Sequence, residues 1–158
     1  MAVTIRRASR EDSDELGRML VELCTYEMRF DPLVEPVEGC EDYLIEYTWR
    51  GVEAHAGVVY FAEEATEVAG FVSGWTERRD GRLWRVSRLG YVDALYVREP
   101  FRSRGVGRAL MAALTERFRA AGLTHLTTDV YMGNEAARRF YASFNMDPTT
   151  VKVEGPMS

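Results

Sequence analysis

Apolar residues recur along this chain at two different spacings, and each spacing predicts its own kind of element. Steps of three and four residues place apolar side chains on one face of a helix. Such steps occur at residues 12–26, 106–121 and 134–144, and less regularly at 41–49. Short apolar or alternating runs are typical of strands. These runs predict strands at residues 3–8, 58–62, 67–75, 83–86, 91–97, 125–131 and 149–153.

The order of these elements predicts the fold class. A strand and two helices come first, strands joined by hairpins follow, and the chain closes with helix, strand, helix and strand. The dipeptide Asp80–Gly81 is a strong hairpin turn signal in the middle group. This order predicts an α/β (α+β) layer sandwich, in which helices cover both faces of a mixed sheet. The length of 158 residues suits a single domain over residues 1–158.

Composition narrows the class of protein. Apolar residues make up 46% of the chain and charged residues 28%, which is ordinary for a soluble domain. No apolar run is as long as a membrane span, and the N-terminus lacks a signal-peptide pattern, so we expect a cytoplasmic protein with no membrane partner. Cys24 and Cys40 have no disulfide or metal-binding spacing, and we expect free thiols. His55 and His125 are far apart in sequence, so we expect no metal site.

Charge is distributed unevenly along the chain. The net charge is −5, but residues 22–46 contain eight acidic residues and only one base, Arg29. An acidic protein with a local arginine cluster is a poor nucleic-acid binder, so we expect no nucleic-acid partner. The asymmetry favours an anionic ligand near the arginines and a cationic ligand near the acids. The alternative is that these acids only solvate a helical surface.

The segment 102–107, Arg-Ser-Arg-Gly-Val-Gly, joins the strand at 91–97 to the helix that starts near residue 106. Helix starts expose unpaired N–H groups, and glycines remove the Cβ atoms that would keep an anion away from them. This pattern predicts a phosphate or pyrophosphate cradle. The dinucleotide fingerprint does not fit, because Leu110 stands where a third glycine is needed, and no lysine follows as in nucleoside-triphosphate loops. An ordinary helix start with surface arginines is the alternative.

Two patterns together carry a family resemblance. Residues 102–107 match [RQ]-x-x-G-x-[GA], and Asn134, Ala137 and Tyr141 match N-x-x-A-x-x-x-Y after the next strand. The chain thereby resembles the GNAT superfamily of N-acetyltransferases. The resemblance implies the GNAT fold, acetyl-coenzyme A as cosubstrate, no metal, and Tyr141 as the acid that protonates the coenzyme sulfur. It also implies that the coenzyme is bound by Leu95, Tyr96, Val97, Arg102, Ser103, Arg104, Gly105, Val106, Gly107, Arg108 and Asn134. On charge alone, we expect Arg138 or Arg139 to reach the adenosine 3′-phosphate.

A narrower resemblance concerns the acceptor. The pair Tyr26–Glu27 and the segment Tyr91-Val92-Asp93 are similar to the diamine (polyamine) acetyltransferase branch. This similarity implies that Tyr26 and Glu27 attract the acceptor amine and that Asp93 accepts its proton. On charge alone, we expect Asp31 to add to the attraction. Asp93 stands for a glutamate of that branch and Ala94 for a second acid, which weakens the match. By strand alternation Asp93 shares a face with residues 95 and 97. The alternative for Asp93 is an ion pair with Arg85 or Arg88.

The leading hypothesis is transfer of an acetyl group from acetyl-coenzyme A to the primary amine of a small cationic acceptor. Polyamines, amino acid derivatives and aminoglycosides belong to this class of acceptor. Acetylation of a protein N-terminus or lysine is a second hypothesis, and a non-catalytic acyl-coenzyme A sensor is a third. Exposed edge strands would also permit a homodimer.

Overall fold

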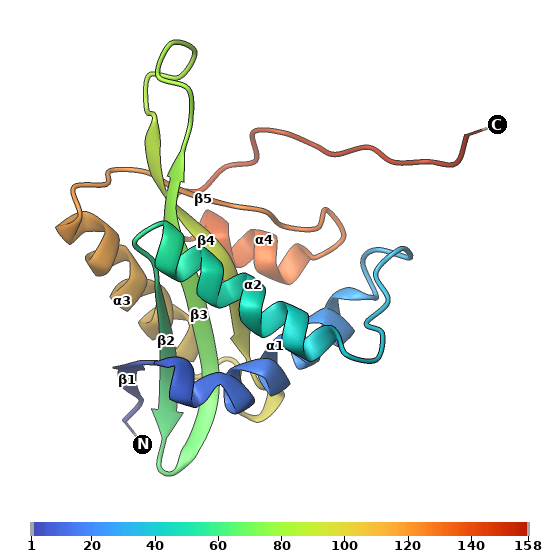
Figure 1. Ribbon diagram of the computed structural model, residues 1–158, viewed down its shortest axis with the longest axis vertical. Helices are drawn as coiled ribbons and strands as arrows, with labels where there is room; N and C mark the ends of the chain where they lie inside the picture. Colours follow the sequence, from blue (N-terminus) through green and yellow to red (C-terminus); the bar gives the residue numbers. More distant parts are fainter. Residues whose placement is uncertain (1, 158) are drawn as a thin grey trace.

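Five strands form one sheet, and their order in space follows their order along the chain (Figure 1). The structure, a computed structural model, describes residues 2–157, so residues 1 and 158 of the predicted domain lie outside it. Neighbouring strands pair antiparallel, except β4 and β5, which are parallel. The predicted mixed sheet is therefore confirmed. Its strands are β1 (Thr4–Arg7), β2 (Val58–Glu64), β3 (Glu67–Arg78), β4 (Arg88–Val97) and β5 (Leu126–Thr128).

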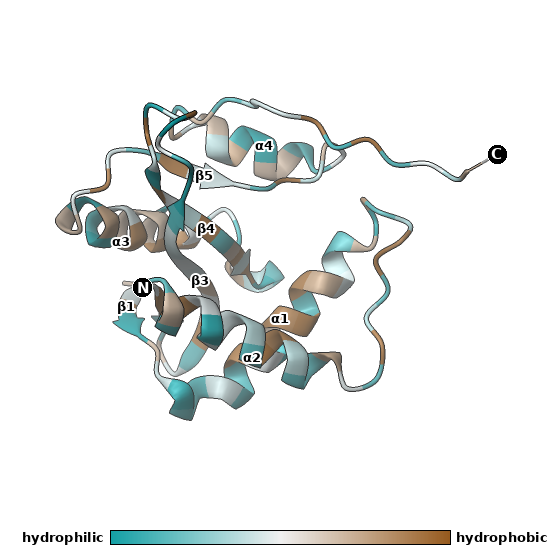
Figure 2. Ribbon diagram, turned by 45° about the horizontal axis from the view of Figure 1, so that its top comes forward, coloured by the Kyte–Doolittle hydropathy of each residue, from teal (hydrophilic) through white to brown (hydrophobic). Residues whose placement is uncertain are grey.

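Helices cover both faces of this sheet, as predicted (Figures 1 and 2). One face is covered by α1 (Ser13–Glu27) and α2 (Cys40–Ala54). The other face is covered by α3 (Val106–Ala120), with α4 (Glu135–Ala142) packed beside it. Short 3-10 turns, η1 (Arg10–Asp12) and η2 (Glu99–Phe101), precede α1 and the loop before α3.

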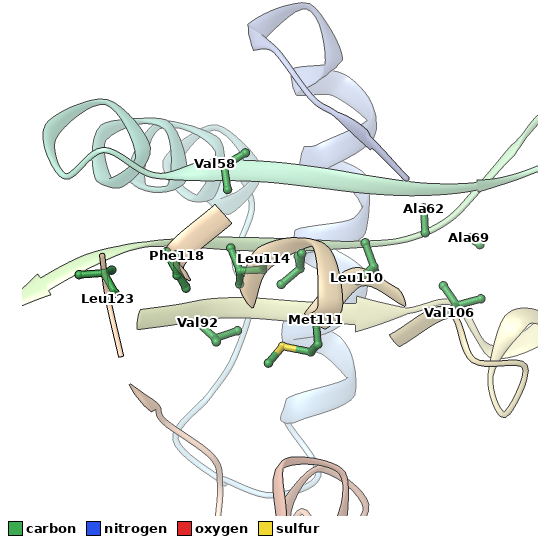
Figure 3. Close-up of a cluster of buried hydrophobic side chains, with 11 residues drawn as sticks. Val58, Ala62, Ala69, Val92, Val106, Leu110, Met111, Leu114, Phe118 and Leu123 are labelled. Atoms are coloured by element: carbon green, nitrogen blue, oxygen red, sulfur yellow. The ribbon is translucent and has the colours of Figure 1, made fainter. Parts of the chain in front are cut away.

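Side chains on successive strand positions enter two buried clusters, because the side-chain direction alternates along a strand. Val58 and Val72 pack under α3, whereas their neighbours Val59 and Phe71 pack under α1 and α2. Figure 3 shows the first cluster, with the apolar stripe of α3 lying against β2, β3 and β4. Burying a side chain of this kind contributes about 1.5–3 kcal/mol. The two-sided burial explains why β3 is apolar almost without interruption from residue 69 to 75.

The predicted strand at residues 83–86 is wrong, and the loop between β3 and β4 is longer than expected. Residues 79–87 form this loop, and the backbone N–H of Arg79 donates to the Ser87 carbonyl at 2.8 Å to close it. Within the loop, the Asp80 carbonyl accepts two further backbone hydrogen bonds. The backbone of this segment is therefore satisfied locally and does not pair as a strand.

The predicted strand at residues 149–153 is also wrong. This segment is exposed along its whole length and makes no strand pairing, and both Figure 1 and Figure 2 show the tail running away from the helices and sheet. The alternation of Val151 and Val153 with polar residues suits a strand. A strand also needs a neighbouring edge to supply hydrogen-bond partners, and none of the described strands lies beside this tail.

Candidate active site

The register between β3 and β4 slips at Asp93. Ser73 pairs with Ala94 and the next residue, Gly74, pairs with Val92, so Asp93 has no partner on β3. Such a bulge shifts the alternation of side chains by one position. Leu95 therefore packs with the α3 cluster, whereas Ala94 packs with the α1–α2 cluster.

The expectation that Asp93 shares a face with Leu95 and Val97 is wrong for this reason. The Asp93 carboxylate accepts a hydrogen bond from Ser73 Oγ at 2.9 Å, on the face covered by α1 and α2. Among the described residues no arginine forms an ion pair with Asp93, so the alternative pairing with Arg85 or Arg88 is not present. The bulge thus turns a carboxylate toward the acidic side of the molecule.

The same bulge leaves backbone donors facing an open edge of the sheet. Pairing between β4 and β5 ends at Val92 and Thr128. Before the bulge, the Gly90 N–H donates toward β5, to the His125 carbonyl, whereas after it the Arg98 N–H donates toward β3. Because donor direction alternates along a strand, the N–H groups of the intervening odd-numbered residues, Leu95 and Val97, face the open edge.

The loop after η2 adds a second set of backbone donors. Gly105 precedes α3 with a φ of 83°, a left-handed conformation that favours glycine, and Ser103 has a φ of 60°. The first N–H groups of α3 lack partners within the helix and carry its partial positive charge. At Gly107 a Cβ atom would lie 3.3 Å from the Phe140 ring, so this position is tight. Loop and open edge together fit a ligand that has amide groups along an arm and phosphates at one end.

The arginines of the loop point in different directions. Arg102 donates through Nε to the Val97 carbonyl at 2.8 Å and lies over the rings of Tyr26 and Tyr96. Arg104 instead pairs with Glu64 of β2, which is 4% exposed. Only the backbone of Arg104 thus remains for the predicted cradle, while Arg102 keeps its guanidinium near the open edge.

Asn134 is the N-cap of α4, and Tyr141 lies in its last turn. The Asn134 side chain caps the helix, since its Oδ1 accepts a hydrogen bond from the Ala137 N–H at 3.1 Å. Burial raises the pKa of the Tyr141 phenol to about 12, the Thr128 hydroxyl lowers it, and the negative charge of Glu27 raises it further. A phenol in this environment stays protonated at neutral pH and can act as a proton donor.

A cavity of about 690 Å³ runs along the open edge of β4 and contains most of the predicted residues. Three of them do not line it. Asp31 accepts a hydrogen bond from the Leu33 N–H after α1, Arg138 donates to the Met132 carbonyl, and Arg104 is paired as described above. The predicted residues that do line the cavity are Tyr26, Glu27, Asp93, Leu95, Tyr96, Val97, Arg102, Ser103, Gly105, Val106, Gly107, Arg108, Asn134 and Tyr141.

Asp93 and Glu27, two carboxylates with raised pKa values, lie at the end of the cavity away from the loop. Burial raises the pKa of Asp93 to about 6, although the hydrogen bond from Ser73 opposes this shift. Burial also raises the pKa of Glu27, and the negative charge of Asp93 raises it further. A carboxylate with a pKa near neutrality is better matched to accepting a proton than one with an ordinary pKa.

Several residues of this end were not anticipated from the sequence. Tyr47 of α2, Thr128 at the end of β5, and Asp129 and Tyr131 just beyond it line the cavity. The signal that could have identified Asp129 is its position after a strand that runs parallel to the β4 strand, since the carboxyl ends of parallel strands meet at one edge. Tyr47 carried no such signal, because its position depends on how α2 packs.

The described part of the chain places no group of three or more histidine, cysteine, aspartate or glutamate side chains that could hold a metal ion. In the same range, residues 2–157, no helix has both the length and the apolar character needed to cross a membrane.

A helix start with unpaired N–H groups, beside an open edge of strand amides, suits an extended, phosphate-bearing ligand. This chain belongs to the acetyltransferase (GNAT) family, whose model matches residues 20–146. The resemblance found in residues 102–107 and 134–141 is therefore confirmed at the level of the family.

One curated relative is the L-methionine sulfoximine/L-methionine sulfone acetyltransferase of Pseudomonas aeruginosa, strain PAO1. It is 36% identical over 89 residues, which cover 56% of this chain and 51% of the relative. The match thus spans about half the length of that relative.

Solved structures share the fold over nearly the whole chain. AAC(6′)-Iy, in complex with the bisubstrate analogue CoA-S-monomethyl-acetylneamine, has a TM-score of 0.72 at 14% identity, covering 100% of this chain and 99% of its own. A predicted acetyltransferase from Clostridium acetobutylicum, solved with acetyl-CoA, has a TM-score of 0.79 at 15% identity, covering 98% and 96%. At these identities the likeness extends to the fold.

Proposed function

We propose that this protein transfers the acetyl group of acetyl-coenzyme A to the primary amine of a small cationic acceptor. Membership of the GNAT family supports the cosubstrate and the reaction class. The acidic end of the cavity, with Glu27 and Asp93, supports a cationic acceptor.

The loop end would hold the cosubstrate. Backbone N–H groups at the start of α3, with Arg102 and Arg108 beside them, would bind the diphosphate. The N–H groups of Leu95 and Val97 would donate to the amide-containing arm and to the thioester oxygen as it gains negative charge. These donors belong to regular elements, so they are oriented before the ligand arrives. Orientation of two bound reactants can lower a barrier by about 7–11 kcal/mol.

Side chains at the acceptor end would take a proton from the amine and give one to the departing sulfur. An alkyl ammonium has an ordinary pKa near about 10 and must lose a proton before its nitrogen can attack. Asp93 would accept that proton, directly or through water, before the nitrogen attacks the thioester carbon, and the nitrogen would release its second proton to water once the new C–N bond has formed. When the C–S bond breaks, Tyr141 would donate its proton to the departing sulfur. Glu27 would hold the acceptor ammonium near Asp93 by charge attraction.

The observation that supports this proposal is that a carboxylate and a phenol line the same cavity, Asp93 and Tyr141. Asp93 comes from the face of β4 covered by α1 and α2, whereas Tyr141 comes from α4 beside the other face. The pKa of Asp93 is raised to about 6 and that of Tyr141 to about 12, so one group is ionised and the other protonated at pH 7.5.

The test is a thiol-release assay with purified protein, acetyl-coenzyme A and a panel of acceptors. The panel contains polyamines, an aminoglycoside, methionine sulfone, and peptides with a free N-terminus or a lysine. We expect release with the small cationic amines and little with the peptides. Peptides as the best acceptors would replace this proposal with protein acetylation. Tight coenzyme binding without release on any acceptor would instead indicate a sensor.

A further inference from the structure

A row of aromatic side chains leads from the surface of α2 to the edge of the sheet. Tyr43 stacks with Tyr47 at a centroid distance of 6.2 Å, Tyr47 meets Trp75 at 6.0 Å, and Trp75 meets Tyr91 at 5.6 Å. Trp75 is buried, but Tyr43 and Tyr47 are 68% and 47% exposed. Of these four residues Tyr47 lines the cavity, so its partly exposed ring offers aromatic surface at the acceptor end.

A third carboxylate stands beside this row. Tyr91 donates through its hydroxyl to Asp129 Oδ2 at 3.2 Å, and Asp129 lines the cavity. After burial, which has the largest effect, the charges of Asp93 and Asp129 both raise the pKa of Tyr47. The Tyr47 phenol is therefore close enough to both carboxylates for their charges to affect its pKa.

The parallel pairing of β4 and β5 brings the two aspartates to the same edge of the sheet. Val92 and Thr128 are register partners, Asp93 follows Val92 in β4, and Asp129 is the first residue after β5. Adjacent strands lie about 4.8 Å apart, and here they begin to separate, because no further pair follows. Asp93 is half-buried and reaches inward to Ser73, whereas Asp129 is exposed. Where β4 and β5 separate, Asp93 is thus an inner carboxylate and Asp129 an outer one.

The positive charges near this opening are already engaged. Arg79 reaches the neighbouring Thr127 hydroxyl at 3.5 Å, but its guanidinium is paired with Glu77 at 2.7 Å, and it does not line the cavity. Arg102 and Arg108 line the loop end of the same cavity. The outer carboxylate therefore has no ionic partner within the described residues.

We propose that Asp129, which accepts a hydrogen bond from the Tyr91 hydroxyl, forms with the ring of Tyr47 an outer subsite for a second cationic group of the acceptor. The inner group at Asp93 would receive the reacting amine, and the outer subsite would bind the distal ammonium. This inference rests on the proposed function and gives its acceptor site a preference for amines that carry at least two positive charges.

The chemistry of the subsite suits an ammonium ion. A carboxylate supplies charge, and the faces of tyrosine rings attract cations by about 0.5–1 kcal/mol at exposed sites. Exposed ion pairs contribute a similar amount, about 0–1 kcal/mol. We therefore expect a preference of roughly three- to tenfold rather than an absolute requirement. An α-amino acid would not gain from it, because its own carboxylate would face Asp129.

The experiment compares matched acceptors on the full-length enzyme. We would measure kcat and KM for putrescine against butylamine and for cadaverine against pentylamine, with acetyl-coenzyme A saturating. The expected result is a roughly three- to tenfold lower KM for each diamine than for its monoamine, with similar kcat. In Asp129→Asn this ratio should fall to near one through a higher KM for the diamines. Asp129→Glu should restore part of the preference, and Asp147→Asn, an exposed acid elsewhere, should keep it.

The possible outcomes distinguish failure of the outer subsite from failure of the proposed acetyl transfer. Equal KM values for diamine and monoamine in the unaltered enzyme would overturn the outer subsite and leave acetyl transfer standing. A diamine preference that survives in Asp129→Asn would also overturn it. If no amine releases thiol although coenzyme A binds in calorimetry, the proposed function itself fails. A fall in kcat for both kinds of acceptor in Asp129→Asn would assign Asp129 to the structure of the site and overturn the subsite.

Discussion

At one end of the cavity, the loop of residues 102–107 and the open edge of β4 present backbone N–H groups. At the other end, carboxylates and aromatic rings converge from α1, α2, β4 and the segment after β5. The donors of the first end are neutral dipoles that belong to a helix and a strand. The groups of the second end are side chains, and burial raises the pKa of Asp93 and Glu27 there.

This difference predicts two kinds of sensitivity. Backbone donors cannot be removed by most substitutions, so the loop end should respond mainly to added bulk or to a changed backbone conformation. A side-chain carboxylate can be neutralised by changing one atom, so the acceptor end should respond to nearly isosteric substitutions. Desolvated carboxylates also cost stability when they are ionised. The acceptor end should thus gain stability from changes that remove its activity.

The largest effect is expected from Asp93→Asn. Removal of the proton acceptor should lower kcat by about 10²–10⁴. The folded protein holds the Asp93 proton more tightly than the unfolded chain, because the folded pKa is about 6 and the ordinary value is 3.8. The free energy of unfolding therefore falls as pH rises through this window, and the variant should be more stable by roughly 1–3 kcal/mol at pH 8.

Thermal unfolding at pH 8 and at pH 4, together with thiol release, measures both parts of that prediction. The gain in stability should shrink toward pH 4, where the carboxyl is protonated in the folded state. Asp147→Asn is the control for the loss of one exposed acid. Full turnover in Asp93→Asn would remove Asp93 from the role of base, and a less stable variant at pH 8 would contradict its desolvation.

The next effect tests the loop end. Gly107→Glu should lower the affinity for coenzyme A by at least about 100-fold, because a side chain meets the Phe140 ring and a negative charge stands at the helix start. Gly107→Gln adds similar bulk without charge and should lose less. Gly155→Glu, where a Cβ meets nothing within 4 Å, is the matched control. Normal affinity of folded Gly107→Glu in calorimetry would refute the cradle.

Tyr141→Phe should have a smaller effect. Loss of the phenol proton should reduce kcat by roughly 10–100-fold, while the affinity for coenzyme A stays nearly constant. Tyr60→Phe on β2, away from the cavity, provides the control for a lost hydroxyl. Unchanged turnover in a folded Tyr141→Phe protein would exclude the proposed acid role. A large loss of coenzyme affinity would assign the phenol to binding instead.

The smallest effect concerns a single hydrogen bond. Ser73 is fully buried, and its hydroxyl stabilises the ionised form of Asp93. Ser73→Ala should therefore raise the pKa of Asp93 further, and the acidic limb of the kcat/KM profile should move from near pH 6 to higher pH by less than about one unit. Ser87→Ala in the loop between β3 and β4 is the control. A limb that moves to lower pH would contradict the direction of this hydrogen bond.

The sequence predicted the loop end better than the acceptor end, and particular residues show why. Gly105 and Gly107 act within a few positions of the helix that they begin, so local order was sufficient. Arg104 was placed in the cradle by the loop motif, but Glu64 lies 40 residues earlier and pairs with its guanidinium. Asp31 and Arg138 were assigned by charge alone, and neither lines the cavity.

By itself, the sequence determined the helices, most of the strands, the family and the glycine loop. These features depend on spacings within a few residues, where periodicity, turn residues and helix starts have local physical causes. The bulge at Asp93, the end of β4–β5 pairing at Val92, and the position of Asp129 and Tyr47 on one cavity became visible in the folded chain. Those features arise because strands and helices distant in sequence compete for the same hydrogen bonds and the same space.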